Sequence, residues 1–289
     1  MEVVVAKSAG FCFGVKRAVS LVYEAAKEHP GKVCTMGPII HNEQVVDDLK
    51  RKGVHVIDDD LIRVDNGEPI SKDSVIIVRS HGIPKMLMEK VKASGCKVVD
   101  ATCPFVRKIH DIVKQKSQEG YHIVIIGNPN HPEVEGIRGW AMGPCTVIND
   151  AEDISEMEGS PDTPICIVSQ TTFNHQKFKD LVEIIEKIRY HVVVTNTICN
   201  ATRERQSEAY EIAGRADAMI VIGGRHSSNT QKLYDICKSR CDNTYYIQTL
   251  DDLVTVNFQS DSYVGITAGA STPNIILQEV FAHVRGTEL

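Results

Sequence analysis

Three cysteines divide the sequence into segments that resemble one another. Cys12, Cys103 and Cys199 lie roughly 90 to 100 residues apart, and each follows a run of β-branched residues. After each cysteine, apolar residues at spacings of three and four predict a helix. A second strand then ends in a glycine, and a polar loop follows. The three glycines are Gly37, Gly127 and Gly223. The sequence is therefore an internal repeat of three units.

Each unit continues with a third apolar strand that also ends in polar residues. These polar ends contain Ser80 and His81 in the first unit, Thr171 and Thr172 in the second, and Ser271 in the third. The first two units then close with a further strand, which the third unit lacks. The N-terminal strand at residues 3–6 can supply it, so that the repeat closes on itself.

Strands that alternate with helices predict βαβ units and parallel sheets. We expect an α/β fold with three small parallel-sheet α/β domains in a pseudo-threefold, trefoil-like arrangement around one central site. The expected domains are 13–102, 103–198 and 199–289, and the N-terminal strand 1–12 completes the last of them. The alternative is a single doubly wound sheet with scattered cysteines.

Ligands of parallel sheets bind at the carboxyl ends of the strands, where the polar residues of this repeat lie. Histidines there can donate hydrogen bonds to an anion, and hydroxyl and amide side chains add neutral donors. The candidate residues are His41, His81, His131, Ser227, Ser228, Asn229 and Ser271. Together with the N–H groups of glycine-rich turns, they predict a small anionic ligand, most simply a phosphate or diphosphate.

Glu133 is the candidate proton donor, because it lies two residues after His131 in one of the polar loops. A carboxyl group in a water-poor cavity has a raised pKa and can act as an acid. Thr171 and Thr172 can relay its proton through a hydroxyl. Alternatively, Glu133 is a first-turn acid that offsets a helix dipole. Among the other histidines, we expect His110 and His175 to be peripheral.

The three cysteines have three chemical interpretations. Pro104 after Cys103 is typical of the first turn of a helix, where the dipole and free N–H groups favour a thiolate. A zinc site would add a fourth ligand or a water, and a nucleophile needs one thiolate with a general base. A [4Fe–4S] cluster on three cysteines leaves one iron open to substrate. We expect the iron–sulfur cluster at the centre of the three domains, with zinc as the alternative.

Composition limits the partners. The net charge of −6 argues against non-specific nucleic-acid binding. The sequence has no apolar run of the roughly 20 residues that span a bilayer, and residues 1–7 lack the pattern of a signal peptide. We therefore expect a cytoplasmic protein with no nucleic-acid or membrane partner. The nine cysteines include no CxxC pair, which disfavours thioredoxin-type chemistry.

Eight motifs occur in order over nearly the whole sequence. They are GFCFGV (10–15), GPIIHN (37–42), RSHG (79–82), DATCP (100–104), NHPE (130–133), SQTT (169–172), NTICNAT (196–202) and AGASTP (268–273). In these eight motifs the sequence resembles the 4-hydroxy-3-methylbut-2-enyl diphosphate reductase family, whose enzymes catalyse the last step of the methylerythritol phosphate route to isoprenoids. That family has a three-domain trefoil fold.

The resemblance implies a cofactor and a set of roles. It implies a [4Fe–4S] cluster with three cysteine ligands, Cys12, Cys103 and Cys199, whose open iron binds the substrate's hydroxyl oxygen. It implies that His131 faces the substrate, that Glu133 delivers the proton with which the hydroxyl leaves as water, and that Thr171 orients it. The residues that it implies for the diphosphate are His41, His81, Ser227, Ser228, Asn229 and Ser271.

The resemblance also implies the partners of the reaction. The substrate is a small allylic diphosphate, the products are isopentenyl and dimethylallyl diphosphate, and two electrons come from reduced ferredoxin, flavodoxin or a similar carrier. The competing hypothesis is a non-catalytic anion-binding or cluster-sensing module, which Glu133 beside His131 disfavours.

Overall fold

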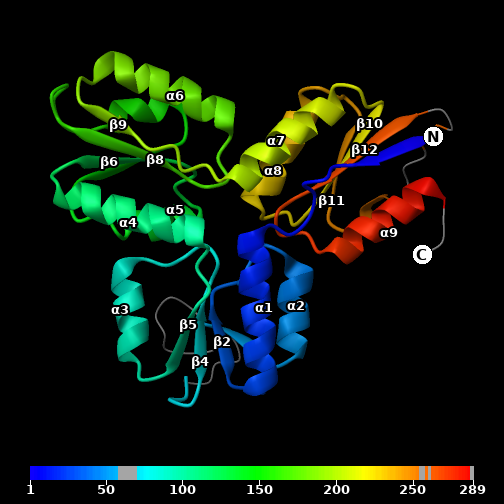
Figure 1. The fold of residues 1–289 in the computed structure, drawn as a ribbon, viewed down its shortest axis with the longest axis horizontal. Helices are drawn as coiled ribbons and strands as arrows, with labels where there is room; N and C mark the ends of the chain where they lie inside the picture. Colours follow the sequence, from blue (N-terminus) through cyan, green and yellow to red (C-terminus); the bar gives the residue numbers. More distant parts are fainter. Residues whose placement is uncertain (58–69, 254–257, 260–261, 287–289) are drawn as a thin grey trace. The chain divides into compact units, whose positions relative to one another are not determined.

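The computed structural model contains three parallel sheets of four strands each (Figure 1). It describes residues 1–57, 70–253, 258–259 and 262–286. The repeat of the sequence is a repeat of topology, because each sheet has the same strand order. In each sheet, the first strand after the cysteine pairs with two strands, the edge strand that follows it in sequence and the third strand. The third strand pairs in turn with the closing strand. The prediction of three parallel α/β units is confirmed.

The first sheet has the order β3-β2-β4-β5. Its strands are β2 (Val33–Met36), β3 (Val54–Ile57), β4 (Val75–Val78) and β5 (Lys97–Asp100). The helices of this segment are α1 (Phe13–Glu28), α2 (Glu43–Arg51) and α3 (Lys85–Ala93). Helices α1 and α2 lie side by side (Figure 1), and the Tyr23 hydroxyl joins them by donating to Asp48 at 2.6 Å.

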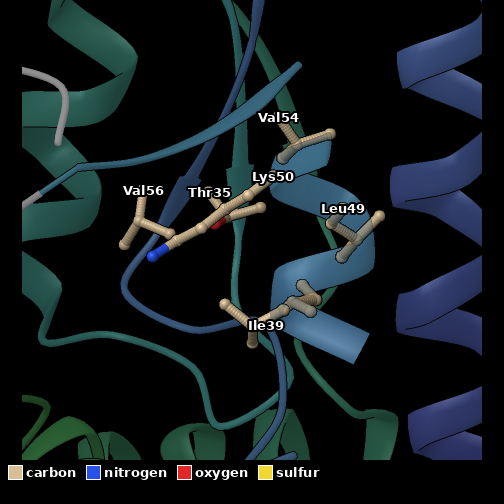
Figure 2. Close-up of a pocket in the computed structure, with 7 residues that line it drawn as sticks. Thr35, Ile39, Leu49, Lys50, Val54 and Val56 are labelled. Atoms are coloured by element: carbon tan, nitrogen blue, oxygen red, sulfur yellow. The ribbon is translucent and has the colours of Figure 1, made fainter. Parts of the chain in front are cut away.

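A small apolar pocket lies where α2 packs on the first sheet (Figure 2). Its lining residues are Thr35, Ile39, Val46, Leu49, Lys50, Val54 and Val56. None of the residues that the sequence predicts for a functional site belongs to this lining.

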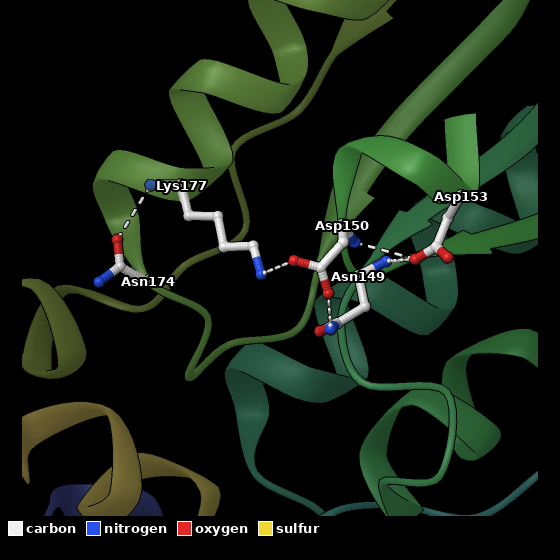
Figure 3. Close-up of polar contacts among 5 residues, drawn as sticks. All are labelled: Asn149, Asp150, Asp153, Asn174 and Lys177. Carbon is white, nitrogen blue, oxygen red and sulfur yellow. Dashed lines mark hydrogen bonds and ion pairs between the residues drawn. The ribbon is translucent and has the colours of Figure 1, made fainter. Parts of the chain in front are cut away.

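The second sheet has the order β7-β6-β8-β9. Its strands are β6 (His122–Ile126), β7 (Cys145–Ile148), β8 (Ile165–Ser169) and β9 (Val192–Val194), and its helices are α4 (Pro104–Gln118), α5 (Pro132–Arg138), η1 (Ala151–Glu156) and α6 (His175–Ile188). The start of η1 is tied to α6 by polar contacts (Figure 3). Asp153 accepts the N–H of Asp150 at 2.9 Å, and Lys177 on α6 forms an ion pair with Asp150.

The third sheet has the order β1-β12-β10-β11 and uses the N-terminus of the chain. Its strands are β1 (Glu2–Val5), β10 (Ala218–Ile222), β11 (Thr244–Ile247) and β12 (Tyr263–Ala268), and its helices are α7 (Asn200–Ala213), α8 (Ser228–Lys238), η2 (Leu250–Leu253) and α9 (Asn274–Arg285). Strand β1 pairs in parallel with β12, with Val4 opposite Gly265. The predicted closure of the third unit by the N-terminal strand is thus observed.

The core is built on the two central strands of each sheet. All residues of β2, β4, β6, β8 and β10 are buried. Helices cover both faces of such strands, and their sequences are therefore nearly continuous apolar runs. None of the helices among the described residues combines the length and apolar character needed to cross a bilayer.

The chain divides into two compact units. One contains residues 1–15, 41–45 and 199–289, and the other contains residues 16–40 and 46–198. The unit of residues 16–40 and 46–198 holds the first and second sheets, and the unit of residues 1–15, 41–45 and 199–289 holds the third sheet. The domain boundaries 13–102, 103–198 and 199–289 and the pseudo-threefold arrangement stay predictions.

Candidate functional site

Each of the three predicted ligand cysteines lies at the start of a helix. Cys103 is the N-cap residue of α4, and its N–H donates to the Ser80 carbonyl at 2.9 Å. The Cys199 sulfur caps α7 by accepting the N–H of Thr202 at 3.4 Å. The sulfur of Cys12, just before α1, accepts the N–H of Val15 at 3.5 Å. Helix N-termini favour negative charge, so these positions suit anionic sulfur ligands.

The three cysteines are divided between the two units. Cys12 and Cys199 belong to one unit, and Cys103 belongs to the other. Within the described ranges, no three His, Cys, Asp or Glu side chains form a metal site. The convergence of the three sulfurs on one cluster therefore stays a prediction.

Several other cysteines lie in environments that keep the thiol protonated. Burial raises the pKa of Cys145 to about 11 and that of Cys237 to about 12. Burial also raises the pKa of Cys166, on β8. Because metal ligands and nucleophiles are thiolates, these three cysteines act as small apolar side chains of the core.

The unit with two sheets brings Glu133 and Thr171 together. Glu133 is in the first turn of α5 and is 2% exposed. Its Oε1 accepts the N–H of Thr171 at 2.5 Å, and its Oε2 accepts the Thr171 hydroxyl at 2.8 Å. Thr171 follows the end of β8. A buried acid is thus held beside a hydroxyl, which is the geometry that a proton relay requires.

His131 lies next to this pair and fixes its own ring by capping α5. Its Nδ1 accepts the N–H of Glu133 at 3.1 Å, so a neutral His131 carries its proton on Nε2. The His81 ring, which follows β4, makes an edge contact with the His131 ring at a centroid distance of 5.5 Å. Four predicted site residues of this unit, His81, His131, Glu133 and Thr171, therefore form one connected cluster.

The other unit groups the remaining predicted residues. The Ser271 hydroxyl, after β12, donates to the carbonyl of His41 at 3.1 Å. Ser227 caps α8, and its Oγ accepts the N–H of Thr230 at 3.3 Å. Ser228 accepts a hydrogen bond from Lys232 Nζ at 2.8 Å. These hydroxyls lie at the carboxyl ends of β10 and β12, where parallel sheets bind ligands.

Asn229 carries the clearest sign of a ligand in this unit. It lies in the first turn of α8 and is 5% exposed. Neither its amide nitrogen nor its amide oxygen has a hydrogen-bond partner in the part of the chain that the structure describes. A buried amide left without partners costs about 1–3 kcal/mol. Its position beside a helix N-terminus therefore suits an anion that accepts the amide N–H.

Sequence reasoning missed two charged residues that hold the loop before Cys12. The Glu208 carboxylate, on α7, accepts the N–H groups of Lys7 at 2.7 Å and Ser8 at 2.9 Å. Arg205, one turn earlier, is buried and donates to the carbonyl of Gly10 at 2.6 Å. The one sequence signal for Arg205 is that it lies six residues after Cys199, on the helix that Cys199 caps.

One histidine that is expected to be peripheral is nevertheless buried. His110 is 4% exposed and stacks on Trp140 with ring centroids 5.2 Å apart. Its ring lies against Gly82, directly after His81. The apolar periodicity of α4 places residue 110 on the inner face beside Ile109, and this periodicity outweighs the polarity of the imidazole.

Comparisons with known proteins agree with the family resemblance that the eight sequence motifs indicate. The family model described as LytB protein matches residues 3–285. The chain is 42% identical over 286 residues to a protein of Caldanaerobacter subterraneus subsp. tengcongensis named 4-hydroxy-3-methylbut-2-enyl diphosphate reductase, covering 99% of this chain and 97% of the relative. The protein of the same name from Aquifex aeolicus is 43% identical over 288 residues, covering 99% and 96%.

Two solved structures extend the similarity to the fold. One is the structure of (E)-4-hydroxy-3-methyl-but-2-enyl diphosphate reductase, described as the terminal enzyme of the non-mevalonate pathway. It is 42% identical, with a TM-score of 0.69 and 99% of each chain covered. The other, from Plasmodium falciparum, is 27% identical with a TM-score of 0.87 over 98% of this chain and 87% of that one. Together with the eight motifs and the three matching sheets, these similarities show that the chain belongs to the LytB protein family.

Proposed function

We propose that this chain is a 4-hydroxy-3-methylbut-2-enyl diphosphate reductase. The reaction removes the hydroxyl group of 4-hydroxy-3-methylbut-2-enyl diphosphate as water. It consumes two electrons and two protons and gives isopentenyl diphosphate or dimethylallyl diphosphate. The observation that carries the proposal is the buried Glu133–Thr171 pair, because it provides an acid and a hydroxyl in the polar cluster that also contains His131.

The residues present fit an iron–sulfur cofactor. Cys12, Cys103 and Cys199 each lie at a helix start, where backbone N–H groups and the helix dipole favour negative charge. The buried cation Arg205, on the helix that Cys199 caps, adds positive charge. We propose that these three cysteines hold a [4Fe–4S] cluster. When bound, the cluster supplies electrons and, at its open iron, a Lewis acid for the substrate's oxygen.

The chain's own side chains supply binding and the proton. Asn229 and the hydroxyls of Ser227, Ser228 and Ser271 donate to the diphosphate, together with His41 and His81. His131 faces the substrate and Glu133 holds the proton for the departing hydroxyl. Thr171, which already contacts both carboxylate oxygens of Glu133, orients that proton. Such general acid catalysis contributes about 10²–10⁴-fold in rate.

The proposed electron donor is reduced ferredoxin, flavodoxin or a similar carrier. Two electrons are needed for each substrate. A small redox protein that meets the chain transiently can deliver them.

Anaerobic purification tests the cofactor and the activity together. The protein should be brown and contain about four iron and four sulfide per chain. It should also convert the substrate when a reduced carrier is supplied. Colourless protein with stoichiometric zinc would overturn the proposal. Loaded protein that binds substrate without turnover would instead support the non-catalytic anion-binding module.

Two cysteine variants test the choice of ligands. Cys103→Ser should lower the iron content well below that of the wild type. Cys96→Ser is the matched control, because Cys96 is also partly exposed but lies outside the helix starts and donates to the carbonyl of Ser71 at 3.4 Å. Iron loss in Cys96→Ser with full iron in Cys103→Ser would show that the ligands are assigned wrongly.

A further inference from the structure

Arg205 is a buried cation without a carboxylate partner among the described residues. It lies on α7 and is 4% exposed. One terminal nitrogen donates to the carbonyl of Ala201 at 3.0 Å, and the other donates to the carbonyl of Gly10 at 2.6 Å. Its Nε–H is buried and finds no acceptor in the described part of the chain. Carbonyl groups orient a guanidinium but do not neutralise its charge.

Two of the groups whose negative charge acts on Arg205 are the sulfurs of predicted cluster ligands. Burial lowers the pKa of Arg205, and negative charge on Cys12 and Cys199 raises it again. Two carboxylates, Glu204 and Glu208, act in the same direction. Glu204 is exposed to water, where its effect is screened. The carboxylate of Glu208 is already bonded to the loop at residues 7–8. Arg205 is hydrogen-bonded to the backbone two residues from each sulfur, at Gly10 before Cys12 and at Ala201 after Cys199.

Arg205 also fixes the backbone that leads to Cys12. Glu208 holds the N–H groups of Lys7 and Ser8, and Arg205 holds the carbonyl of Gly10, two residues before the cysteine. Gly10 has a φ of +90°, which side chains with a Cβ rarely adopt. Helix α7 is thus hydrogen-bonded to the loop at two points, through Glu208 and through Arg205. The same helix begins at Cys199, so Arg205 links the two sulfur positions within one compact unit.

We propose that Arg205 is the buried counter-ion of the Cys12 and Cys199 sulfurs and sets the reduction potential of the cluster that they hold. The inference rests on the proposed function, since it assumes the cluster. An electron accepted from the reduced carrier adds one negative charge near the two sulfurs. A fixed positive charge in a medium of low dielectric constant stabilises that added charge. Arg205 is a positioning residue here, because no contact with the substrate is required of it.

The test is an anaerobic redox titration of the loaded protein, monitored by electron paramagnetic resonance with dithionite as reductant. Arg205→Met removes the charge and should shift the midpoint potential to more negative values. We expect at least a tenfold lower ratio of reduced to oxidised cluster at the wild-type midpoint, which corresponds to about 59 mV for one electron. Arg203→Met is the matched control, because Arg203 lies on the same helix but is exposed and bonds to Asn200. It should leave the potential unchanged.

A fully loaded Arg205→Met protein with the wild-type potential would overturn the inference. If Arg205→Met takes up no iron, Arg205→Lys decides, since lysine keeps the charge and loses the fork-shaped donor group. Restored iron in Arg205→Lys supports the charge role, and iron no higher than in Arg205→Met overturns it. A wild-type chain that binds no iron would instead refute the proposed function itself, so the two failures are distinguishable.

Discussion

Both carboxylate oxygens of Glu133 are held by one residue, Thr171. The backbone N–H of Thr171 donates to Oε1 at 2.5 Å, and its hydroxyl donates to Oε2 at 2.8 Å. The backbone bond fixes the carboxyl group, and the hydroxyl can rotate. Thr171 can therefore donate to the carboxylate or accept from the carboxylic acid, and this choice is what a proton relay needs.

Replacing the acid should reduce turnover without loss of the cluster. Glu133→Gln keeps the shape of the side chain but cannot release a proton, so we expect kcat to fall by about 10²–10⁴-fold. Thr171→Val keeps the N–H donor and removes only the hydroxyl, and it should lower kcat about tenfold. Turnover with chemically reduced carrier measures both variants, and their iron content is the control. Wild-type turnover by Glu133→Gln would remove the proton-donor role.

Asn229 should affect affinity and stability in opposite directions. Asn229→Leu replaces a buried amide that lacks partners with an apolar group of similar size, and such exchanges are neutral or stabilising. We therefore expect an equal or higher Tm together with at least about tenfold weaker substrate binding. Thermal unfolding and calorimetric titration check the two effects. Asn243→Leu, at an exposed position, should not change binding. A lower Tm with unchanged affinity would show that Asn229 is structural.

Gly82 should be intolerant of a side chain because of His110. Gly82 has a φ of +73°, and a Cβ there would lie 2.5 Å from the His110 ring. We expect Gly82→Ala to lower the free energy of unfolding by about 1–3 kcal/mol. Gly95→Ala is the matched control, since Gly95 has a φ of +79° with nothing within 4 Å of the added Cβ. Equal losses in the two variants, measured by urea unfolding, would show that the His110 contact does not matter.

The repeat made the fold predictable from the sequence. Buried strands such as β6 and β10 are apolar runs that end in glycine, and this pattern repeats with the cysteines. Repetition also showed that the third unit lacks a strand, which led to the pairing of β1 with β12. Such inferences need only the order of elements along the chain, and they hold wherever parallel βαβ units form.

The contacts around the candidate site were less predictable. Arg205 contacts Gly10, which is 195 residues away in sequence, and no local pattern shows that a charged residue of a helix turns inward. The burial of His110 likewise depends on tertiary packing, because its ring stacks on Trp140. Glu133 and Thr171 were selected as residues at strand ends, but their direct contact depends on the packing of α5 against β8. Tertiary packing determines these details, and local sequence does not.

His110 should make the stability of the chain depend on pH in the acid range. Burial lowers the pKa of His110 to about 4, from a usual value near 6.5, while Asp100 acts to raise it and Arg107 to lower it. The unfolded chain therefore binds a proton at a higher pH than the folded chain does. Stability from this group is present above pH 6.5 and is lost as the pH falls toward 4. Between pH 7 and 4.5 the loss is about 2 kcal/mol.

Urea unfolding of the full chain at several pH values measures this effect. His110→Gln cannot take up the proton and should flatten the dependence, whatever its effect on absolute stability. Some slope should persist, because burial also lowers the pKa of His122. His226→Gln, at a position whose side chain is 83% exposed, should keep the wild-type slope. If His110→Gln and the wild type lose stability equally between pH 7 and 4.5, His110 is not the group that links folding to protonation.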